Sequence, residues 1–464
     1  MLSASFIPVY AGLRARGDEA EARRVAAAVA ALLGLATAVL VLAGVLLTPW
    51  LIAIIAPGFT GEKREVTIRL VRILFPGAGL LVLSAWCLGV LNSHRRFFLS
   101  YSAPVLWNLA IIAALVGFGR GTAAYRLTEI TAWGSVVGSL LQLGIQLPMV
   151  ARLLDGIRPR LARGSAAVAE VLHNFGPVFV GRGVVQISAY VDTVLASLLP
   201  TGAVAGLSYA QVIYTLPVSL FGMSVSAAEL PAMASAVGSE AERASYLRGR
   251  LDGGLRQIAF FVVPSATAFL ALGDVVAGAL YQSGAFTGAM AVYVWAILAG
   301  SAVGLLASTM GRLYASTYYA LHDTRTPLRF AVLRVALTIG LGYLFALPLP
   351  RALGLEPRWG AAGLTASAGI AGWIEFLLLR RALNRRIGPT GLPAAVALRL
   401  WVAAALGAGA AWALRWVLPA GLHPIAGAAG ILGAFGLVYL AATTAMGVPE
   451  ARRLSGRFRR GPAG

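Results

Sequence analysis

Residues 181–234 read GRGVVQISAYVDTVLASLLPTGAVAGLSYAQVIYTLPVSLFGMSVSAAELPAMA, two apolar runs that are each long enough to cross a membrane. Spanning the hydrocarbon core takes roughly 20 helical residues. Arg182 and Asp192 nevertheless lie inside the first run. An ionisable side chain near the bilayer centre costs on the order of 3 kcal/mol, so it usually faces a helix bundle or a cavity. The stretch therefore predicts a helical membrane protein with an internal polar site, as in a transporter.

The composition of the whole chain points to the same class. Of 464 residues, 59% are hydrophobic and only 12% are charged, whereas soluble domains carry roughly 25% charged residues. The net charge of +20 does not indicate a nucleic-acid partner, because the basic residues cluster in short loops between apolar runs. Cys87 is the only cysteine and the four histidines form no ligand spacing, so we expect no metal and no cofactor.

We predict an all-α polytopic membrane protein with twelve complete spans. Residues 2–13 are too short to span, and we expect them to be the end of a helix whose beginning precedes Met1. The spans lie at about 25–55, 66–92, 98–119, 128–151, 171–199, 204–235, 255–280, 288–318, 328–347, 360–379, 397–418 and 424–447.

The basic residues also predict the orientation. Twenty-seven lie in alternate loops and in the C-terminal tail, and positive loops stay in the cytoplasm. We therefore expect a multi-pass protein of the bacterial inner membrane with a cytoplasmic C-terminus. The opposite loops hold only six, namely Lys63, Arg64, Arg120, Arg126, Arg351 and Arg358.

Two ordered matches indicate an internal repeat. Ser3–Ala11 matches Ser226–Ala234 at an offset of 223, and Pro57–Gly61 matches Gly284–Gly288 at an offset of 227. Repeats of this kind are typical of transporters. We predict two pseudo-symmetric lobes, at 1–151 and 170–386, joined by a linker at 152–169 and followed by a terminal helix pair with a basic tail at 387–464. The second lobe begins near Glu170, so an offset of 223 predicts that the first lobe begins about 50 residues before Met1.

Several of these segments resemble one known family. SASFIPVYAGLRARGDEAEARR (3–24), LNSHRRFF (91–98), QISAYVDTVLASLLP (186–200) and YALHDTRTP (319–327) are similar to the MurJ (MviN) family of lipid II flippases, within the larger MOP group of exporters. The resemblance implies fourteen helices in two six-helix lobes plus a terminal pair. It also implies export of lipid II, the undecaprenyl-diphosphate-linked peptidoglycan precursor, by alternating access between the lobes.

The chain departs from the family pattern at one expected site. The family's eighth helix carries a tyrosine-alanine-aspartate-arginine motif followed by a glutamate. Here the motif reads Tyr209-Ala210-Gln211-Val212, with Thr215 where the glutamate falls, so these charges are absent. By position, we still expect Tyr209, Gln211 and Thr215 to line the substrate path.

Three polar residues of the preceding helix complete the predicted substrate site. Arg182 lies close to mid-membrane, and its guanidinium suits a diphosphate. Gln186 is one turn further on the same face and would share that contact. The alternative for Arg182 is that it extends to the interface or pairs within the bundle. Asp192, about 15 Å further along, would pair with an arginine, couple a cation or proton, or lie near the outer interface.

Four other charged residues fall near span ends. We expect Glu229 and Glu375 to pair with loop arginines, and Arg334 and Arg415 to extend to the interface.

The sequence therefore predicts a transporter, with no enzyme motif, that flips lipid II for cell-wall synthesis while surrounded by membrane lipids. Coupling to the membrane potential or to an ion is expected, since no nucleotide-binding motif exists. Two alternatives stay open. One is another MOP exporter, for a drug or a polysaccharide-linked lipid, and the other is a non-transporting scaffold for envelope synthesis.

Overall fold

The computed structural model describes residues 2–156, 166–419 and 422–452, without the side chains of 2–4, 174 and 176–189. All regular elements in these ranges are helices, and eleven of them are long and apolar enough to cross a membrane. These eleven match eleven of the predicted spans. The remaining prediction, 171–199, falls on a helix of 32 residues, α6 (Ala166–Ser197). The chain divides into two compact units, Met1–Val194 and Leu195–Gly464, which we describe separately.

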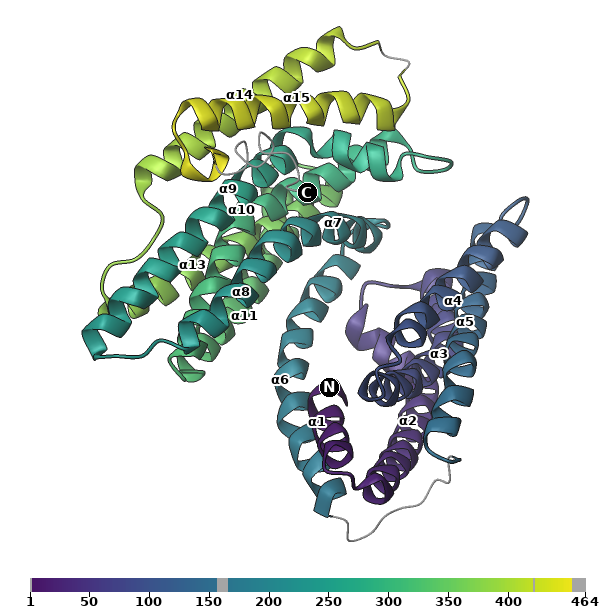
Figure 1. Cartoon of the computed structure of the whole chain (residues 1–464). Coiled ribbons are helices and arrows are strands. Elements are labelled where there is room, and N and C mark those ends of the chain that lie inside the picture. Colours follow the sequence, from purple (N-terminus) through teal and green to yellow (C-terminus); the bar gives the residue numbers. More distant parts are fainter. Residues whose placement is uncertain (1, 157–165, 420–421, 453–464) are drawn as a thin grey trace, which may run out of the picture. The chain divides into compact units, whose positions relative to one another are not determined.

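The first unit is a helical bundle. It contains α1 (Leu2–Ala15), α2 (Glu19–Ile55), α3 (Gly61–Ser93), α4 (Phe97–Phe118), α5 (Ala124–Leu153) and most of α6 (Figure 1). Asp18 begins α2, because its side chain accepts the Glu21 amide. Phe6 and Tyr10 of α1 are fully buried against Trp86 and Leu91 of α3. A polar contact also joins α3 to α5, since the Ser84 hydroxyl donates to Gln146 at 2.6 Å.

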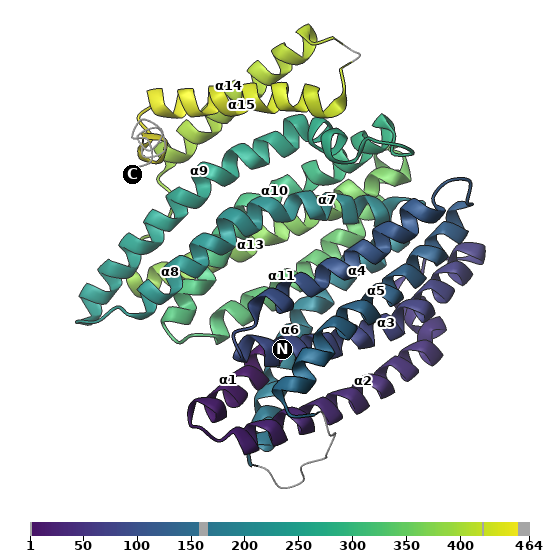
Figure 2. The ribbon, with the colours of Figure 1, turned by 45° about the vertical axis from the view of Figure 1, so that its right-hand side comes forward.

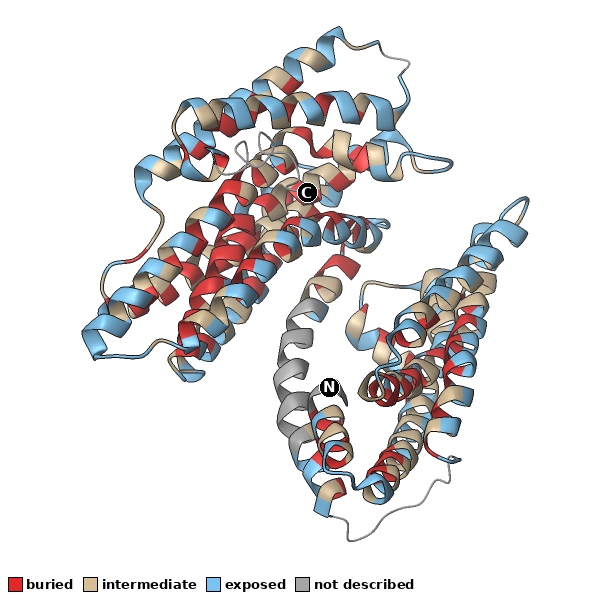
Figure 3. Cartoon of the chain, in the orientation of Figure 1, coloured by how far each residue is buried: buried red, intermediate tan, exposed pale blue. Residues whose placement is uncertain are grey.

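The second unit carries the same order of helices and adds a terminal pair. It comprises α7 (Ala203–Pro217), η1 (Val218–Met223), α8 (Ser224–Ala234), α9 (Glu240–Tyr281), α10 (Gly288–Ala320), α11 (Arg325–Ala346), α12 (Pro348–Ala352), η2 (Pro357–Trp359), α13 (Gly360–Ile387), α14 (Ala394–Val417) and α15 (Pro424–Ala445). α9, α10 and α13 run side by side (Figure 2), and buried residues gather along them (Figure 3).

Element lengths bear out the predicted repeat. α3 and α10 both have 33 residues and begin 227 positions apart, while α4 and α11 both have 22 residues. α3 packs on α2 and α5, and α10 packs equivalently on α9 and α13. After α3 and α10 the chain turns through a left-handed residue, Arg95 (φ 57°) in one unit and His322 (φ 57°) in the other. Two pseudo-symmetric lobes are therefore confirmed.

The predicted lobe boundaries differ from this contact-based division. The division falls between Val194 and Leu195, near the end of α6, and not within 152–169. It also keeps the terminal pair with the second unit, because α14 and α15 pack on α9. Tyr439 donates to the Phe260 carbonyl at 2.6 Å, and Trp412 donates to the Ala271 carbonyl at 3.1 Å. The finer lobe limits stay a prediction.

Ion pairs between helices correct two expectations. Arg334 of α11 and Arg415 of α14 do not simply extend to the interface. Arg334 pairs with Glu375 of α13 at 3.1 Å, so the expectation that Glu375 pairs with a loop arginine is also wrong. Arg415 pairs with Asp274 of α9 at 2.8 Å. Charges held between packed helices need a counter-ion, and the adjacent helix supplies it.

The remaining expected pair is present. Glu229 of α8 accepts from Arg250 of α9 at 2.7 Å, and Arg250 belongs to the arginine-rich segment between two predicted spans.

The HDTRTP motif has a structural role. Asp323 accepts the backbone amides of Arg325 and Thr326 at 3.0 and 2.9 Å, which fixes the start of α11. The same carboxylate pairs with Arg386 of α13 at 2.7 Å. These hydrogen bonds, the Thr326 amide first, lower the pKa of Asp323 to about 2.

Candidate functional site

The second unit carries a stripe of polar side chains along α7 and η1. At 100° per residue, its members fall within about 80° of one another around the helix. Next to it lies an exposed apolar face that includes Val212 and Leu220, at 60% and 61% exposure. The stripe consists of Ser208, Gln211, Thr215 and Ser219, and none of the four is buried.

Each hydroxyl of the stripe is tied to its own helix. Thr215 Oγ1 donates to the Gln211 carbonyl at 2.8 Å, and Ser219 Oγ donates to the Thr215 carbonyl at 2.8 Å. This back-bonding occupies the hydroxyl proton and leaves the oxygen lone pairs as acceptors. Gln211 Nε2 in turn donates to Thr215 Oγ1 at 3.3 Å. The stripe therefore offers uncharged acceptors and one amide, which suits hydroxyl and amide groups of a ligand better than phosphate.

A π-helical segment interrupts this helix where the stripe ends. Pro217 has no amide hydrogen, so it cannot donate to the Ile213 carbonyl, and η1 follows it at once. Ser224 Oγ donates to the Ser219 carbonyl five residues back, at 3.0 Å. π-helical turns are rare and frequently occur at functional sites. The π-helical segment thus places a local irregularity at the Ser219 end of the stripe.

The structure brings together only some of the predicted site residues. Gln211 and Thr215 are hydrogen-bonded neighbours. Tyr209 lies outside the stripe, where its ring packs against Tyr281 at 4.8 Å and Phe286 at 5.5 Å between centroids. The Tyr281 hydroxyl also donates to the Tyr209 carbonyl at 3.3 Å. This aromatic cluster ties α7 to the end of α9.

The predicted residues of α6 belong to the first unit, up to Val194. Asp192 is half-buried, five residues before the helix ends. The side chains of Arg182 and Gln186 lie outside the described residues. Among the described residues, His, Cys, Asp and Glu form no group of three that could hold a metal ion.

Sequence reasoning missed Ser208 and Ser219 as parts of the site. The signal was present, because hydroxyl residues at 208, 215 and 219 and the amide at 211 recur every three or four positions in an apolar run. Single serines in membrane helices are common, so the pattern gains meaning only when the exposed side of α7 is known.

Comparison with known proteins identifies the family. A family model described as "Lipid II flippase MurJ" matches residues 1–425. The chain belongs to the MurJ family. A lipid II flippase MurJ of Burkholderia cenocepacia is 30% identical over 393 residues, covering 83% of this chain and 73% of the relative. A probable lipid II flippase MurJ of Rhizobium meliloti is 31% identical over 383 residues, covering 81% of this chain and 69% of the relative.

Solved structures agree on the fold. A MurJ structure in an inward closed conformation covers 98% of this chain and 88% of its own length, with a TM-score of 0.75 and 21% identity. A MATE multidrug transporter of the MOP superfamily, facing inward, covers 83% of this chain and 86% of its own, with a TM-score of 0.60 and 17% identity. The MurJ-family chain described here is thus a multi-pass membrane protein with the fold of MOP transporters.

Proposed function

We propose that this protein flips lipid II across the inner membrane by alternating access between its two lobes, supplying cell-wall synthesis. The MurJ family match over residues 1–425 carries the proposal. The likeness to a MATE transporter concerns the fold alone, and no comparison supports a drug exporter or a scaffold. The arginine-rich loops support a cytoplasmic C-terminus.

The stripe on α7 supports a role of the second unit in binding one portion of the substrate. Lipid II joins a diphosphate to sugars and a peptide, which are rich in hydroxyl and amide groups. Ser208, Gln211, Thr215 and Ser219 are neutral and accept hydrogen bonds, so they suit the sugar and peptide portion. The diphosphate requires a cation, and Arg182 with Gln186 on α6 is our proposal for that role.

Energy would come from the membrane potential or from an ion. Moving one charge through 100 mV supplies about 2.3 kcal/mol, which is enough to bias a rocking cycle. Asp192 is the residue of α6 that we propose for such coupling. Dissipating the potential across proteoliposomes should slow lipid II transfer, and unchanged transfer would exclude coupling to the potential.

Two substitutions test the site. In proteoliposomes holding fluorescent lipid II, transfer is measured by the loss of label accessible to a membrane-impermeant quencher. Arg182→Ala should abolish transfer. Gln211→Leu with Thr215→Val should reduce transfer by about thirtyfold, since each of the two lost hydrogen bonds to a ligand removes about 1 kcal/mol. Thr267→Val is the matched control, because the Thr267 hydroxyl is back-bonded on α9 in the same way, at 3.0 Å.

Complementation of a flippase-depleted strain provides the readout in cells. If wild-type protein transfers no lipid II and does not complement, the proposed function is wrong. If wild-type protein is active and all three variants match it, the function stands and the proposed site residues are wrong.

A further inference from the structure

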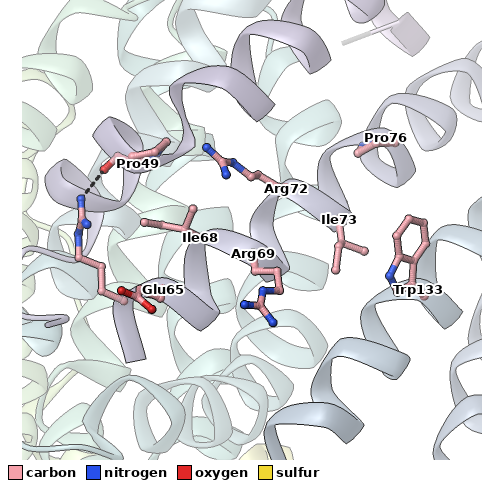
Figure 4. A pocket seen from close by; sticks show the side chains of 9 residues that line it. Pro49, Glu65, Ile68, Arg69, Arg72, Ile73, Pro76 and Trp133 are labelled. Carbon is pink, nitrogen blue, oxygen red and sulfur yellow. Dashed lines mark hydrogen bonds between the residues drawn. The ribbon is translucent and has the colours of Figure 1, made fainter. Parts of the chain in front are cut away.

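A second candidate site lies in the first unit, on helices other than α6. It is a cavity of about 550 Å³ between α2, α3 and α5 (Figure 4). That volume is within the range of ligand pockets, roughly 300–1,000 Å³. Arg64, Arg69 and Arg72 of α3 line it together with Trp133 of α5. Three guanidinium groups at one opening in a membrane-spanning bundle require an explanation.

Arg72 is held in place by a defect in α2. Pro49 has no amide hydrogen, so the Val45 carbonyl loses its helical donor. The Thr48 hydroxyl donates chiefly to the Gly44 carbonyl, at 2.6 Å, and lies 3.1 Å from the Val45 carbonyl. Arg72 Nε supplies a donor to the Val45 carbonyl at 3.2 Å. This bond uses one edge of the guanidinium. The two terminal nitrogens of Arg72 have no hydrogen-bond partner among the described residues, so they remain able to bind an anion.

The two other arginines of the cavity have different partners: Arg64 donates to a backbone carbonyl, and Arg69 pairs with a carboxylate. Arg64 Nη2 donates to the Pro49 carbonyl at 3.3 Å (dashed line in Figure 4). Arg69 pairs with Glu129 of α5 at 3.7 Å. Within the described ranges, neither Arg64 nor Arg72 forms an ion pair with a carboxylate. Glu65 also lines the cavity, so the five charges sum to one net positive charge, and a bound anion would balance it.

The depth of the cavity fits the level of lipid headgroups. α3 has 33 residues and is about 50 Å long, so about 10 Å at each end projects beyond a centred hydrocarbon core of about 30 Å. Arg72 is about 16 Å of rise from Gly61, which places its Cα about 6 Å inside that boundary, within reach of the headgroups for a long arginine side chain. Trp133 and Trp50 are 55% and 73% exposed, and exposed tryptophans gather at the membrane interface. Ile68 and Ile73 line the same cavity and give it an apolar wall. A ligand here would meet guanidinium groups at one end and hydrocarbon at the other.

We propose that this cavity binds the phosphate group of a phospholipid in the leaflet opposite the arginine-rich loops. Arg64 and Arg72 hold the phosphate, and one acyl chain lies along Ile73 and Trp133. The chemistry shared with a free anion is phosphate recognition by guanidinium groups. What favours a lipid is the interfacial depth together with the apolar wall. The proposal concerns the first unit alone and does not depend on the flippase function.

Photo-crosslinking of the purified full chain tests this site. The probe is phosphatidylglycerol with a photoreactive group near its phosphate, and crosslinks are mapped by mass spectrometry. Crosslinks to the 61–76 segment should fall about 25-fold in Arg64→Gln/Arg72→Gln, because each interfacial arginine contributes roughly fivefold to binding of an anionic lipid. Crosslinks elsewhere on the chain should stay constant, which shows that the variant is folded.

Two further variants and a competitor complete the design. Arg126→Gln, an exposed arginine of α5 outside the cavity, should leave the crosslinks unchanged. Ile68→Glu keeps both arginines and adds a carboxylate to the cavity, so it should also remove the crosslinks. Millimolar inorganic phosphate should have no effect. Undiminished crosslinking in both the arginine and the Ile68→Glu variants would overturn the site, and displacement by inorganic phosphate would overturn the assignment to a lipid.

Discussion

Gly304 on α10 allows a close helix contact in the second unit. A Cβ built on Gly304 would strike the backbone of Gly369 on α13, and a Cβ on Gly369 would lie 2.7 Å from the Gly304 nitrogen. Backbone atoms cannot rotate away, so Gly304→Ala must push α10 and α13 apart. Overpacking of this kind typically costs about 1–3 kcal/mol. Small residues at such contacts are what allow membrane helices to approach closely.

Gly311→Ala on the same helix is the matched control. A Cβ at Gly311 meets nothing within 4 Å, so this variant should gain the helix propensity of alanine, up to about 1 kcal/mol. Gly304→Ala gains the same propensity, and the comparison therefore isolates the steric cost. At about 2–4 °C per kcal/mol, Gly304→Ala should melt roughly 2–12 °C below Gly311→Ala. Thermal unfolding in one detergent at one scan rate measures this difference. Equal melting temperatures would refute the close contact between α10 and α13.

Three more predictions concern charged and polar groups. Asp323→Asn keeps an acceptor for the amides that begin α11 but loses the negative charge that pairs with Arg386. It should lower the free energy of unfolding by about 1 kcal/mol at neutral pH. Because the folded pKa of about 2 lies below the ordinary value of 3.8, that difference should be complete above about pH 4 and vanish as the pH falls toward 2, measured by thermal unfolding. Burial and the nearby Arg14 lower the pKa of His94, so protonation should destabilise the fold below about pH 6.5, and His94→Gln should flatten that part of the stability profile. Arg334→Gln leaves Glu375 without its partner and should lower the free energy of unfolding by about 1 kcal/mol, whereas Arg334→Gln/Glu375→Gln should recover most of the loss in the same melting assay.

Local sequence patterns predicted the helices because membrane spans depend on local hydropathy. The repeat could also be predicted from the sequence, because Ser3–Ala11 matches Ser226–Ala234 and Pro57–Gly61 matches Gly284–Gly288 at nearly the same offset. Interhelical ion pairs were not readable. Arg334 contacts Glu375 only because α11 and α13 pack at one particular register. The hydropathy of a single span carries no information on that register, so it predicts only that each charge extends to the nearest membrane interface. The same limit applies to Arg72, whose partner at Val45 is exposed by a proline in another helix.

The candidate site on α7 was also predicted only in part from the sequence. Gln211 and Thr215 were predicted by position in a family motif whose charges they lack, and that lack raised the alternative of a scaffold without transport. The stripe argues for a retained site of altered chemistry. Hydroxyls bonded to their own helix cost little in lipid. The side-chain amide of Gln211, by contrast, has one hydrogen-bond partner among the described residues, the Thr215 hydroxyl. A glutamine facing hydrocarbon would leave hydrogen-bonding groups unsatisfied, at about 1–3 kcal/mol each. A lipid-facing α7 would therefore favour an apolar residue at 211, and glutamine there indicates that this side of α7 meets water or substrate. On this reasoning Gln211→Leu should lower lipid II transfer and leave the melting temperature nearly unchanged, whereas a purely structural glutamine would lose stability and leave transfer unchanged.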